Sequence, residues 1–149
     1  MNAIEAVDNH NLAEVLPLIG EYQAFYQVAH IDDARNQAFF SQFGQQHPQG
    51  CLFLYRDQGQ VVGFATVYFS FSSTLVGKVG VLNDLYVRAG LRGRGIGRAL
   101  IEHTWQYAQT QGAQRLQWVT APTNHTAQRL YDGLPTRKSE WFFYTYQGE

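Results

Sequence analysis

The stretch RGRGIGR at residues 92–98 combines three arginines and three glycines between a hydrophobic segment and an amphipathic one. Glycine lets a backbone turn tightly and come close to a ligand, and each arginine adds a fixed positive charge. Where a helix starts, its first N–H groups lack intrahelical partners, and the helix dipole makes that end positive. The stretch therefore predicts a cradle for a pyrophosphate group.

Other phosphate-binding patterns fit this stretch less well. A P-loop requires Gly-x4-Gly-Lys-Ser/Thr, and no Lys-Ser pair follows these glycines. The dinucleotide-binding fingerprint requires Gly-x-Gly-x-x-Gly after a first strand, whereas here the spacing is Gly-x-Gly-x-Gly in mid-chain. A solvated basic loop is the remaining alternative, but three glycines at two-residue spacing carry a high entropic cost for a plain turn.

The elements that must position this loop follow from hydrophobic periodicity. Strands are expected over residues 2–7, 51–56, 60–71, 79–87, 115–121 and 140–147, and helices over 10–27, 32–43, 95–112 and 124–133. The sequence DQG at 57–59 predicts a hairpin turn, Asp8 is expected to cap the first helix, and Pro17 to kink or divide it. The order β-αα-β-β-β-α-β-α-β predicts an α/β fold, with one mixed sheet and helices on both faces, in a single domain over residues 1–149.

The composition limits the class of protein. Hydrophobic residues make up 45% of the chain and charged residues 15%, which suits a packed core and is too little charge for disorder. The net charge of -1 gives no reason to expect a nucleic-acid or membrane partner, and no signal peptide or long apolar run is present, so a cytoplasmic protein is expected. No two of the five histidines have metal-binding helical spacing, so no metal is expected, and Cys51 is expected to be a buried thiol.

Three motifs in order resemble one family. Residues 92–97 resemble the Arg/Gln-x-x-Gly-x-Gly/Ala signature with which the GNAT superfamily of N-acetyltransferases binds the pyrophosphate of acetyl-CoA. LNDLYV at 82–87 is similar to the LEDLYV strand of the histone/polyamine and spermidine/spermine acetyltransferases, and residues 118–133 resemble their next strand and Asn-x-x-Ala-x-x-Leu-Tyr helix. The resemblance implies that acetyl-CoA is the cofactor.

The resemblance also implies where the cofactor binds. Acetyl-CoA would lie between two strands that separate near Val87 and Val119, and its pantetheine arm would pair with backbone like an added strand. The residues expected to bind it are Leu85, Tyr86, Val87, Arg92, Gly93, Arg94, Gly95, Ile96, Gly97, Arg98, Asn124 and Ala127. Tyr131 is the expected catalytic acid for the leaving thiolate, and a core tyrosine on a short helix is the alternative.

The acceptor side is expected on the first two helices, which wall the acceptor pocket in relatives. Tyr22, Phe25 and Tyr26 lie within one helical turn, and such an aromatic wall with nearby carboxylates suits a cationic amine. Packing of these aromatics on the sheet explains them equally well. Asn83 and Asp84 complete the expected substrate-binding set.

The general base stays open at this point. Asn83 stands where the polyamine enzymes carry glutamate, and an asparagine side chain cannot accept a proton. Asp84 follows it, but neighbouring residues of a strand face opposite sides, so Asp84 fits a structural role as well as a substrate-binding one. A water relay or a carboxylate from another element, such as Glu140, is a further alternative.

The sequence therefore predicts an acetyl-CoA-dependent N-acetyltransferase. Its acceptor is expected to be a primary amine, a small cationic amine or polyamine, that attacks directly in a ternary complex. The alternatives are a protein-lysine acetyltransferase, a non-catalytic acyl-CoA-binding sensor, and a structural module that dimerises through the aromatic segment WFFYTY at 141–146. A homodimer with no nucleic-acid and no membrane partner is expected.

Overall fold

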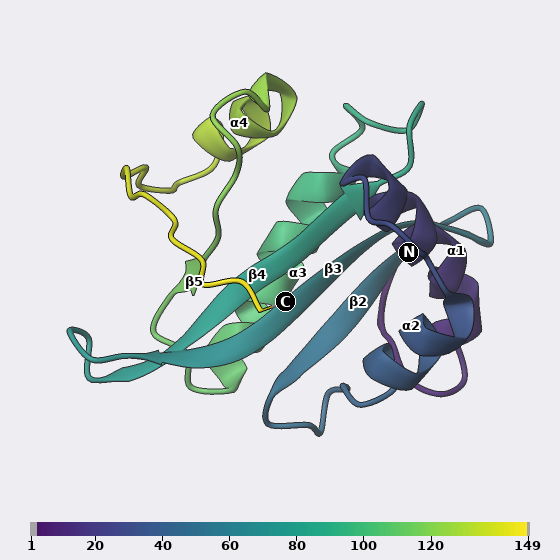
Figure 1. Ribbon diagram of the computed structural model, residues 1–149, viewed down its shortest axis with the longest axis horizontal. Helices are drawn as coiled ribbons and strands as arrows, with labels where there is room; N and C mark the ends of the chain where they lie inside the picture. Colours follow the sequence, from purple (N-terminus) through teal and green to yellow (C-terminus); the bar gives the residue numbers. More distant parts are fainter. Residues whose placement is uncertain (1–2, 149) are drawn as a thin grey trace. The chain divides into compact units, whose positions relative to one another are not determined.

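A computed structural model of the protein describes residues 3–148, in two compact units, Met1–Val119 and Thr120–Glu149. The first unit holds a five-stranded sheet in the order β1-β2-β3-β4-β5 (Figure 1). Strands β1 to β4 are antiparallel neighbours, and β5 runs parallel to β4. The elements are β1 (Ile4–Ala6), α1 (Leu12–Phe25), α2 (Asp33–Phe40), β2 (Gly50–Asp57), β3 (Gln60–Ser72), β4 (Gly77–Val87), α3 (Ile96–Thr110), β5 (Leu116–Gln117) and α4 (His125–Asp132).

Helices cover both faces of the sheet, as predicted. Leu52 and Leu54 of β2 share a hydrophobic cluster with the buried residues of α1. Phe53, which lies between them, contacts His103 and Tyr107 of α3, with ring centroids 4.7 and 5.2 Å apart. Because side chains alternate along a strand, the buried apolar residues Cys51–Leu54 of β2 pack against helices on both sides of the sheet.

Cys51 is buried at the start of β2, as expected. Its residue is 0% exposed, and burial raises the pKa of the thiol to about 12. The thiol is therefore protonated and shielded from solvent at neutral pH.

The predicted hairpin turn forms between β2 and β3. Gln58 and Gly59 have φ angles of 51° and 79°, so both central residues occupy the left-handed region, as a two-residue turn of type I′ requires. The next hairpin has a slightly shorter loop than the predicted strands imply. Strand β3 runs to Ser72 and β4 begins at Gly77, so residues 73–76 form the loop.

The first helix begins later than the sequence predicts, whereas the second begins next to its predicted start. Asp8 was expected to cap α1, but the helix begins at Leu12, with Asn11 at the N-cap position. The Asp8 carboxylate instead accepts the N–H of His10 at 2.8 Å and orders the preceding turn. In α2, by contrast, Asp32 caps the helix by accepting two backbone N–H groups of the first turn, at 2.9 and 3.2 Å.

Helix α1 continues through Pro17, so this residue does not divide the helix, and the expected kink stays a prediction. Proline removes one intrahelical hydrogen bond. The neighbouring residues Leu16, Leu18 and Ile19 are buried, and their packing offsets that loss.

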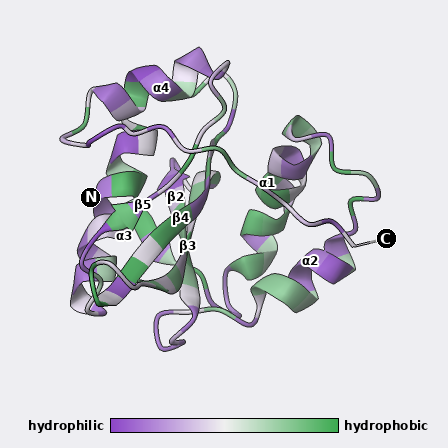
Figure 2. Cartoon of the chain, turned by 60° about the vertical axis from the view of Figure 1, so that its left-hand side comes forward, coloured by the Kyte–Doolittle hydropathy of each residue, from purple (hydrophilic) through white to green (hydrophobic). Residues whose placement is uncertain are grey.

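The second unit contains α4, which is largely polar (Figure 2) and has no fully buried residue. The predicted strand at 140–147 is wrong, because no strand is assigned there. Trp141, Phe142, Phe143, Tyr144 and Tyr146 are 86–107% exposed. High strand propensity alone does not form a strand without a backbone partner.

The predicted strand at 115–121 is shorter than expected, since β5 comprises only Leu116–Gln117. No helix among residues 3–148 is both long and apolar enough to cross a membrane.

Candidate active site

An open strand edge lies on β4. Strand β4 pairs with β5 only at Gly80–Leu116 and Val81–Gln117. Its other edge pairs with β3 as far as Val87. Six residues of β4 therefore extend past the last β5 pair with one edge lacking a strand partner among residues 3–148.

A β-bulge at Asn83 interrupts β4. Thr66 of β3 pairs with Asp84, and the next residue, Val67, pairs with Leu82, so Asn83 is an extra residue without a partner in β3. A bulge of this kind shifts the alternation of the strand by one residue. The sequence carried no visible signal for it.

The bulge decides which backbone groups reach the open edge. Before it, Gly80 donates its N–H toward β5, to Arg115 O at 2.9 Å. After it, Arg88 donates its N–H to a β3 carbonyl at 2.8 Å. By alternation, Leu85 and Val87 turn their backbone groups to the open edge, as an added strand would require.

The glycine-rich loop leads from β4 into α3. Gly93 and Gly95 have φ angles of 82° and 81°, a conformation that L-residues with a side chain rarely adopt, and Gly95 is the N-cap of the helix. The first helical hydrogen bond runs from Ala99 N–H to Gly95 O at 3.0 Å. The N–H groups of residues 96–98 therefore lack intrahelical partners, as the predicted anion cradle requires.

Arg92 folds back on the strand that precedes it. Its Nε donates to the Val87 carbonyl at 3.1 Å, and its guanidinium lies 5.9 Å from the centre of the Tyr86 ring. Arg92 thus contacts both the open edge, at Val87, and the ring of Tyr86.

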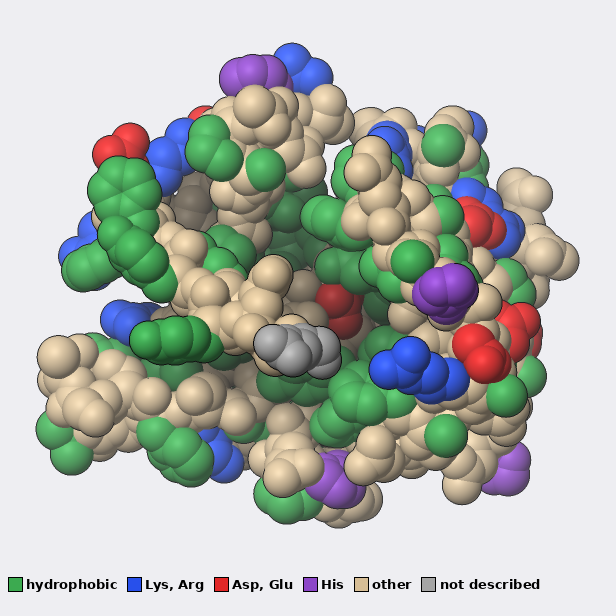
Figure 3. Space-filling view, in the orientation of Figure 1, with side chains coloured by type: hydrophobic (Ala, Val, Ile, Leu, Met, Phe, Trp, Pro, Cys, Tyr) green, Lys and Arg blue, Asp and Glu red, His purple; other side chains and the backbone are tan. Residues whose placement is uncertain are grey.

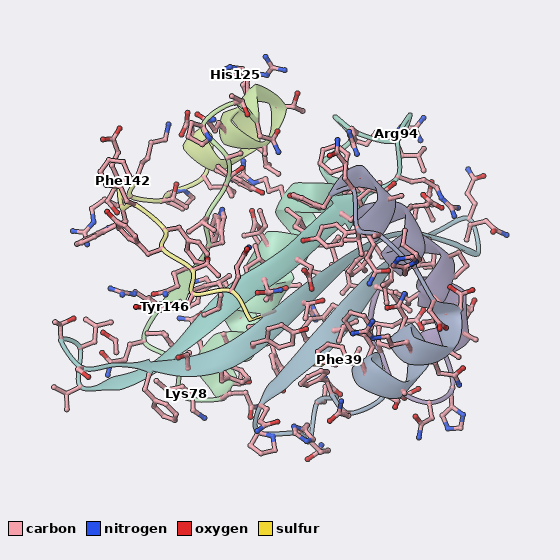
Figure 4. All side chains as sticks on the ribbon, in the orientation of Figure 1. Phe39, Lys78, Arg94, His125, Phe142 and Tyr146 are labelled. Carbon is pink, nitrogen blue, oxygen red and sulfur yellow. The ribbon has the colours of Figure 1, made fainter. Side chains whose placement is uncertain are left out.

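The other two arginines of the loop differ in their partners. Arg98 forms an ion pair with Glu102, one turn along α3, with Nε and Oε1 2.7 Å apart. Arg94 is exposed on the loop (Figure 4), and within residues 3–148 its side chain makes no ion pair or hydrogen bond. Arg94 is therefore the guanidinium most available to an anion.

The aromatic residues of α1 divide into a packed and an exposed group. Tyr22 lies against the sheet, with its ring centroid 5.6 Å from Phe64 and 6.1 Å from Tyr86. Phe25 and Tyr26 are 57% and 58% exposed, and each ring contacts its neighbour along the helix. On the surface over α1 and α2, hydrophobic side chains lie beside charged ones (Figure 3).

A charge pair joins α1 to the end of β4. Glu21 Oε2 lies 2.8 Å from the Arg88 Nη2 atom, and Tyr86 OH donates to Glu21 Oε1 at 3.0 Å. The hydrogen bond from Arg88 holds the pKa of Glu21 below its usual range. The carboxylate is therefore already neutralised within the protein, and the pair joins residues too far apart in sequence for their contact to be predicted.

Asn83 and Asp84 differ strongly in burial. Asn83 is exposed, whereas Asp84 is 8% exposed and accepts a hydrogen bond from Asn83 Nδ2 at 3.1 Å. Burial raises the pKa of Asp84, and hydrogen bonds from Tyr22, Thr66 and Asn83 oppose that rise. Thr66 Oγ1 is itself buried and lacks a hydrogen-bond partner of ordinary geometry, so Tyr22 and Asn83 are the firmer donors.

The remaining predicted site residues belong to α4, in the second unit. Asn124 caps α4, and its Oδ1 accepts the Ala127 N–H at 3.1 Å. Tyr131 is partly buried near the helix end, and its carbonyl accepts the Thr136 hydroxyl at 2.8 Å. The spacing of residues 124, 127 and 131 puts all three on one face of the helix.

A surface depression lies elsewhere in the first unit, away from this site. Among residues 3–148, no group of three or more His, Cys, Asp or Glu side chains could hold a metal ion. The depression, of about 370 Å³, lies at the C-terminal end of α3 and is lined by residues that include Gln45, His47, Tyr107 and Gln111. The glycine-rich loop is at the other end of the same helix, roughly 20 Å away at 1.5 Å per residue.

Comparison with known proteins gives a family match. Residues 16–134 match the acetyltransferase (GNAT) family. An uncharacterised N-acetyltransferase of Bacillus subtilis is 28% identical over 129 residues, which cover 87% of this chain and 85% of that protein.

Two further relatives have named substrates. The D-amino-acid N-acetyltransferase of Saccharomyces cerevisiae is 39% identical over 82 residues, or 55% of this chain and 51% of that protein. The thialysine N-epsilon-acetyltransferase of Bos taurus is 33% identical over 93 residues, or 60% of this chain and 54% of that protein. The matched segment thus spans about half the length of the yeast and bovine relatives.

A solved structure shares the fold. The crystal structure of a probable acetyltransferase superposes with a TM-score of 0.84 at 25% identity, covering 98% of this chain and 97% of that one. The likeness confirms the predicted α/β fold.

Proposed function

We propose an acceptor for a chain that belongs to the acetyltransferase (GNAT) family and is an N-acetyltransferase that uses acetyl-CoA. The proposed acceptor is the primary amine of a small cationic molecule such as a polyamine. The observation that carries the proposal is the aromatic surface of Tyr22, Phe25 and Tyr26 on the helix that packs over Asp84. Aromatic faces attract cations, and the attraction grows where water is partly excluded. Asn83, exposed beside Asp84, completes the proposed acceptor side.

The open β4 edge and the loop after it are the proposed cofactor site. Leu85 and Val87 offer backbone groups for the pantetheine arm, and the free amides of residues 96–98 together with Arg94 suit the pyrophosphate. Bound there, acetyl-CoA supplies the acetyl group as a thioester.

Helix α4 carries the remaining residues that we assign to cofactor binding and catalysis. We assign Asn124 and Ala127 to cofactor binding, since they share one face of α4 with Tyr131. The Tyr131 hydroxyl is proposed to donate a proton to the departing sulfur. The amine attacks directly, without an acetylated enzyme group.

An acceptor screen tests the proposed substrate class. Purified protein and acetyl-CoA are combined with a diamine, a polyamine, a lysine-containing peptide and a D-amino acid, and thiol release is followed. We expect the highest kcat/KM on the diamine or polyamine, and a KM that rises with salt because screening weakens attraction of the cation. Activity confined to amines with a free carboxylate would overturn the proposal.

A D-amino acid is a second candidate acceptor, because the yeast relative is named for that activity. The same screen separates the two candidates by their carboxylate. Thiol release on the peptide alone would indicate a protein-lysine acetyltransferase, and cofactor binding without thiol release on any amine would indicate an acyl-CoA sensor.

We also propose a homodimer. The five exposed aromatic residues between 141 and 146 form more apolar surface than a monomer usually presents to water. Sedimentation of the parent and of Phe143→Ser at matched concentrations tests this. A monomeric parent would exclude the dimer.

A further inference from the structure

Asp84 is a buried acidic residue whose partners are all neutral. Its residue is 8% exposed, and its carboxyl group accepts hydrogen bonds from the side chains of Tyr22 and Asn83. Among residues 3–148, no Lys, Arg or His side chain forms an ion pair with it. Asp84 is therefore unlike Glu21 and the other carboxylates of this unit that pair with arginine.

A carboxylate in this setting is energetically unfavourable. Burial of a charge without a counter-charge carries a large desolvation cost, so buried charges in proteins are usually paired or neutralised. In agreement, burial raises the pKa of Asp84 by more than its hydrogen bonds lower it. In the protein without its acceptor, binding of either a cation or a proton would therefore stabilise the buried Asp84 carboxylate.

The bulge in β4 places the Asp84 side chain on the face of the sheet where α1 and the proposed acceptor side lie. Asp84 and Tyr86 are alternate residues after the bulge, and both contact Tyr22 of α1. Leu85, which lies between them, turns its backbone to the open edge. The carboxyl group therefore belongs to the residue directly before Leu85, whose backbone faces the edge where the thioester is proposed to bind.

Resting on the proposed function, we propose that Asp84 receives a proton from the acceptor ammonium before acetyl transfer. An N–H bond breaks, its electron pair stays on nitrogen, and an O–H bond forms on the carboxylate. The neutral amine then attacks the thioester carbonyl carbon, and the C–S electron pair leaves with sulfur. Tyr131 donates its proton to that sulfur and regains the second N–H proton, and Asp84 releases its proton to water, so the net products are an amide, a thiol and one proton.

The neighbours of Asp84 leave it as the titrating group on this face. Tyr22 from α1 and Asn83 from β4 are hydrogen-bond donors to it. Tyr68 from β3 also faces it, and burial together with the negative charge of Asp84 raises the pKa of Tyr68 well above its usual range. Glu21 of α1 and Arg88, which directly follows β4, form an ion pair with each other.

A pair of acceptors that differ mainly in basicity tests the proposal. Ethylamine is protonated at neutral pH, whereas trifluoroethylamine is largely neutral and needs no base before attack. We expect Asp84→Asn to lower kcat/KM on ethylamine by about 100-fold or more, in the range of general-base catalysis, and on trifluoroethylamine by less than about threefold. Acetyl-CoA affinity should be unchanged, and Asp57→Asn, on the β2–β3 hairpin, is the matched control. Equal losses on both amines, or no loss, would overturn the proposal.

Stability gives a second measurement that needs no acceptor. Because the pKa of Asp84 is raised in the folded protein, its contribution to stability falls as pH rises through that value. Asp84→Asn should therefore raise Tm, and raise it more at about pH 8 than near the unfolded pKa of about 3.9. A lower Tm at both pH values would make Asp84 a structural hydrogen-bonding residue and overturn the inference. If the parent acetylates no amine while the Tm pattern holds, the proposed acceptor class fails and the proton-accepting role falls with it.

Discussion

Arg94 should contribute more to acetyl-CoA binding than any other arginine of the loop. Its side chain has no partner within residues 3–148, whereas Arg92 contacts the end of β4 and Arg98 pairs with Glu102. Arg94→Ala therefore removes a free positive charge beside the α3 amides without breaking an interaction of the protein. A hydrogen bond between charged groups is worth roughly 1.5–3 kcal/mol, so Kd should rise about 10- to 150-fold.

Calorimetry with acetyl-CoA is the assay for this prediction, at low and at physiological salt. The loss should shrink as salt rises, because screening weakens the contact already in the parent. Arg35→Ala is the matched control, since Arg35 is exposed in the first turn of α2 and forms no ion pair within residues 3–148. Both variants should keep the parent Tm. If the two variants bind acetyl-CoA equally well, Arg94 does not contribute to binding of the pyrophosphate.

Three further substitutions have defined outcomes. Tyr131→Phe should lower kcat by about 100-fold with acetyl-CoA affinity nearly intact, measured by steady-state kinetics, and a kcat within about threefold of the parent would remove the acid role. Gly95→Ala should cost about 1–2 kcal/mol in unfolding free energy, measured in urea, because alanine is strained at a φ of 81°; an unchanged midpoint would contradict this conformation. Glu21→Gln should lower Tm at neutral pH by a small amount, because the Arg88 pair is half-exposed. Since that pair depresses the pKa of Glu21, its stabilisation is present above the unfolded pKa of about 4.3, and the Tm gap should close as pH falls below that value; a gap independent of pH would argue against the charge pair.

Local chemistry explains which features could be predicted from the sequence. The turn at Gln58 and Gly59, the caps Asp32 and Asn124, and the glycine-rich helix start each depend on neighbouring residues only. Their physical causes, a left-handed backbone or a side chain within reach of free amides, are visible in a few consecutive letters. The motif at residues 92–97 therefore gave both the loop and the family.

Features that depend on distant partners could not be predicted. The pairing of β3 with β4 decides that Asn83 bulges, and only then do Asp84 and Tyr86 share the α1 side. The Glu21–Arg88 ion pair likewise joins two elements that the chain brings together only on folding. The segment 140–147 has strong strand propensity, but propensity does not supply the partner that a strand needs.

The burial of Cys51 has a practical consequence for assays. Its thiol is 0% exposed with a pKa of about 12, and it is the single cysteine of the chain. A colorimetric thiol reagent should therefore report only the free CoA that turnover releases, with no background from the folded enzyme. A cysteine introduced at an exposed position, such as residue 58 of the hairpin, would accept one fluorophore at one known place.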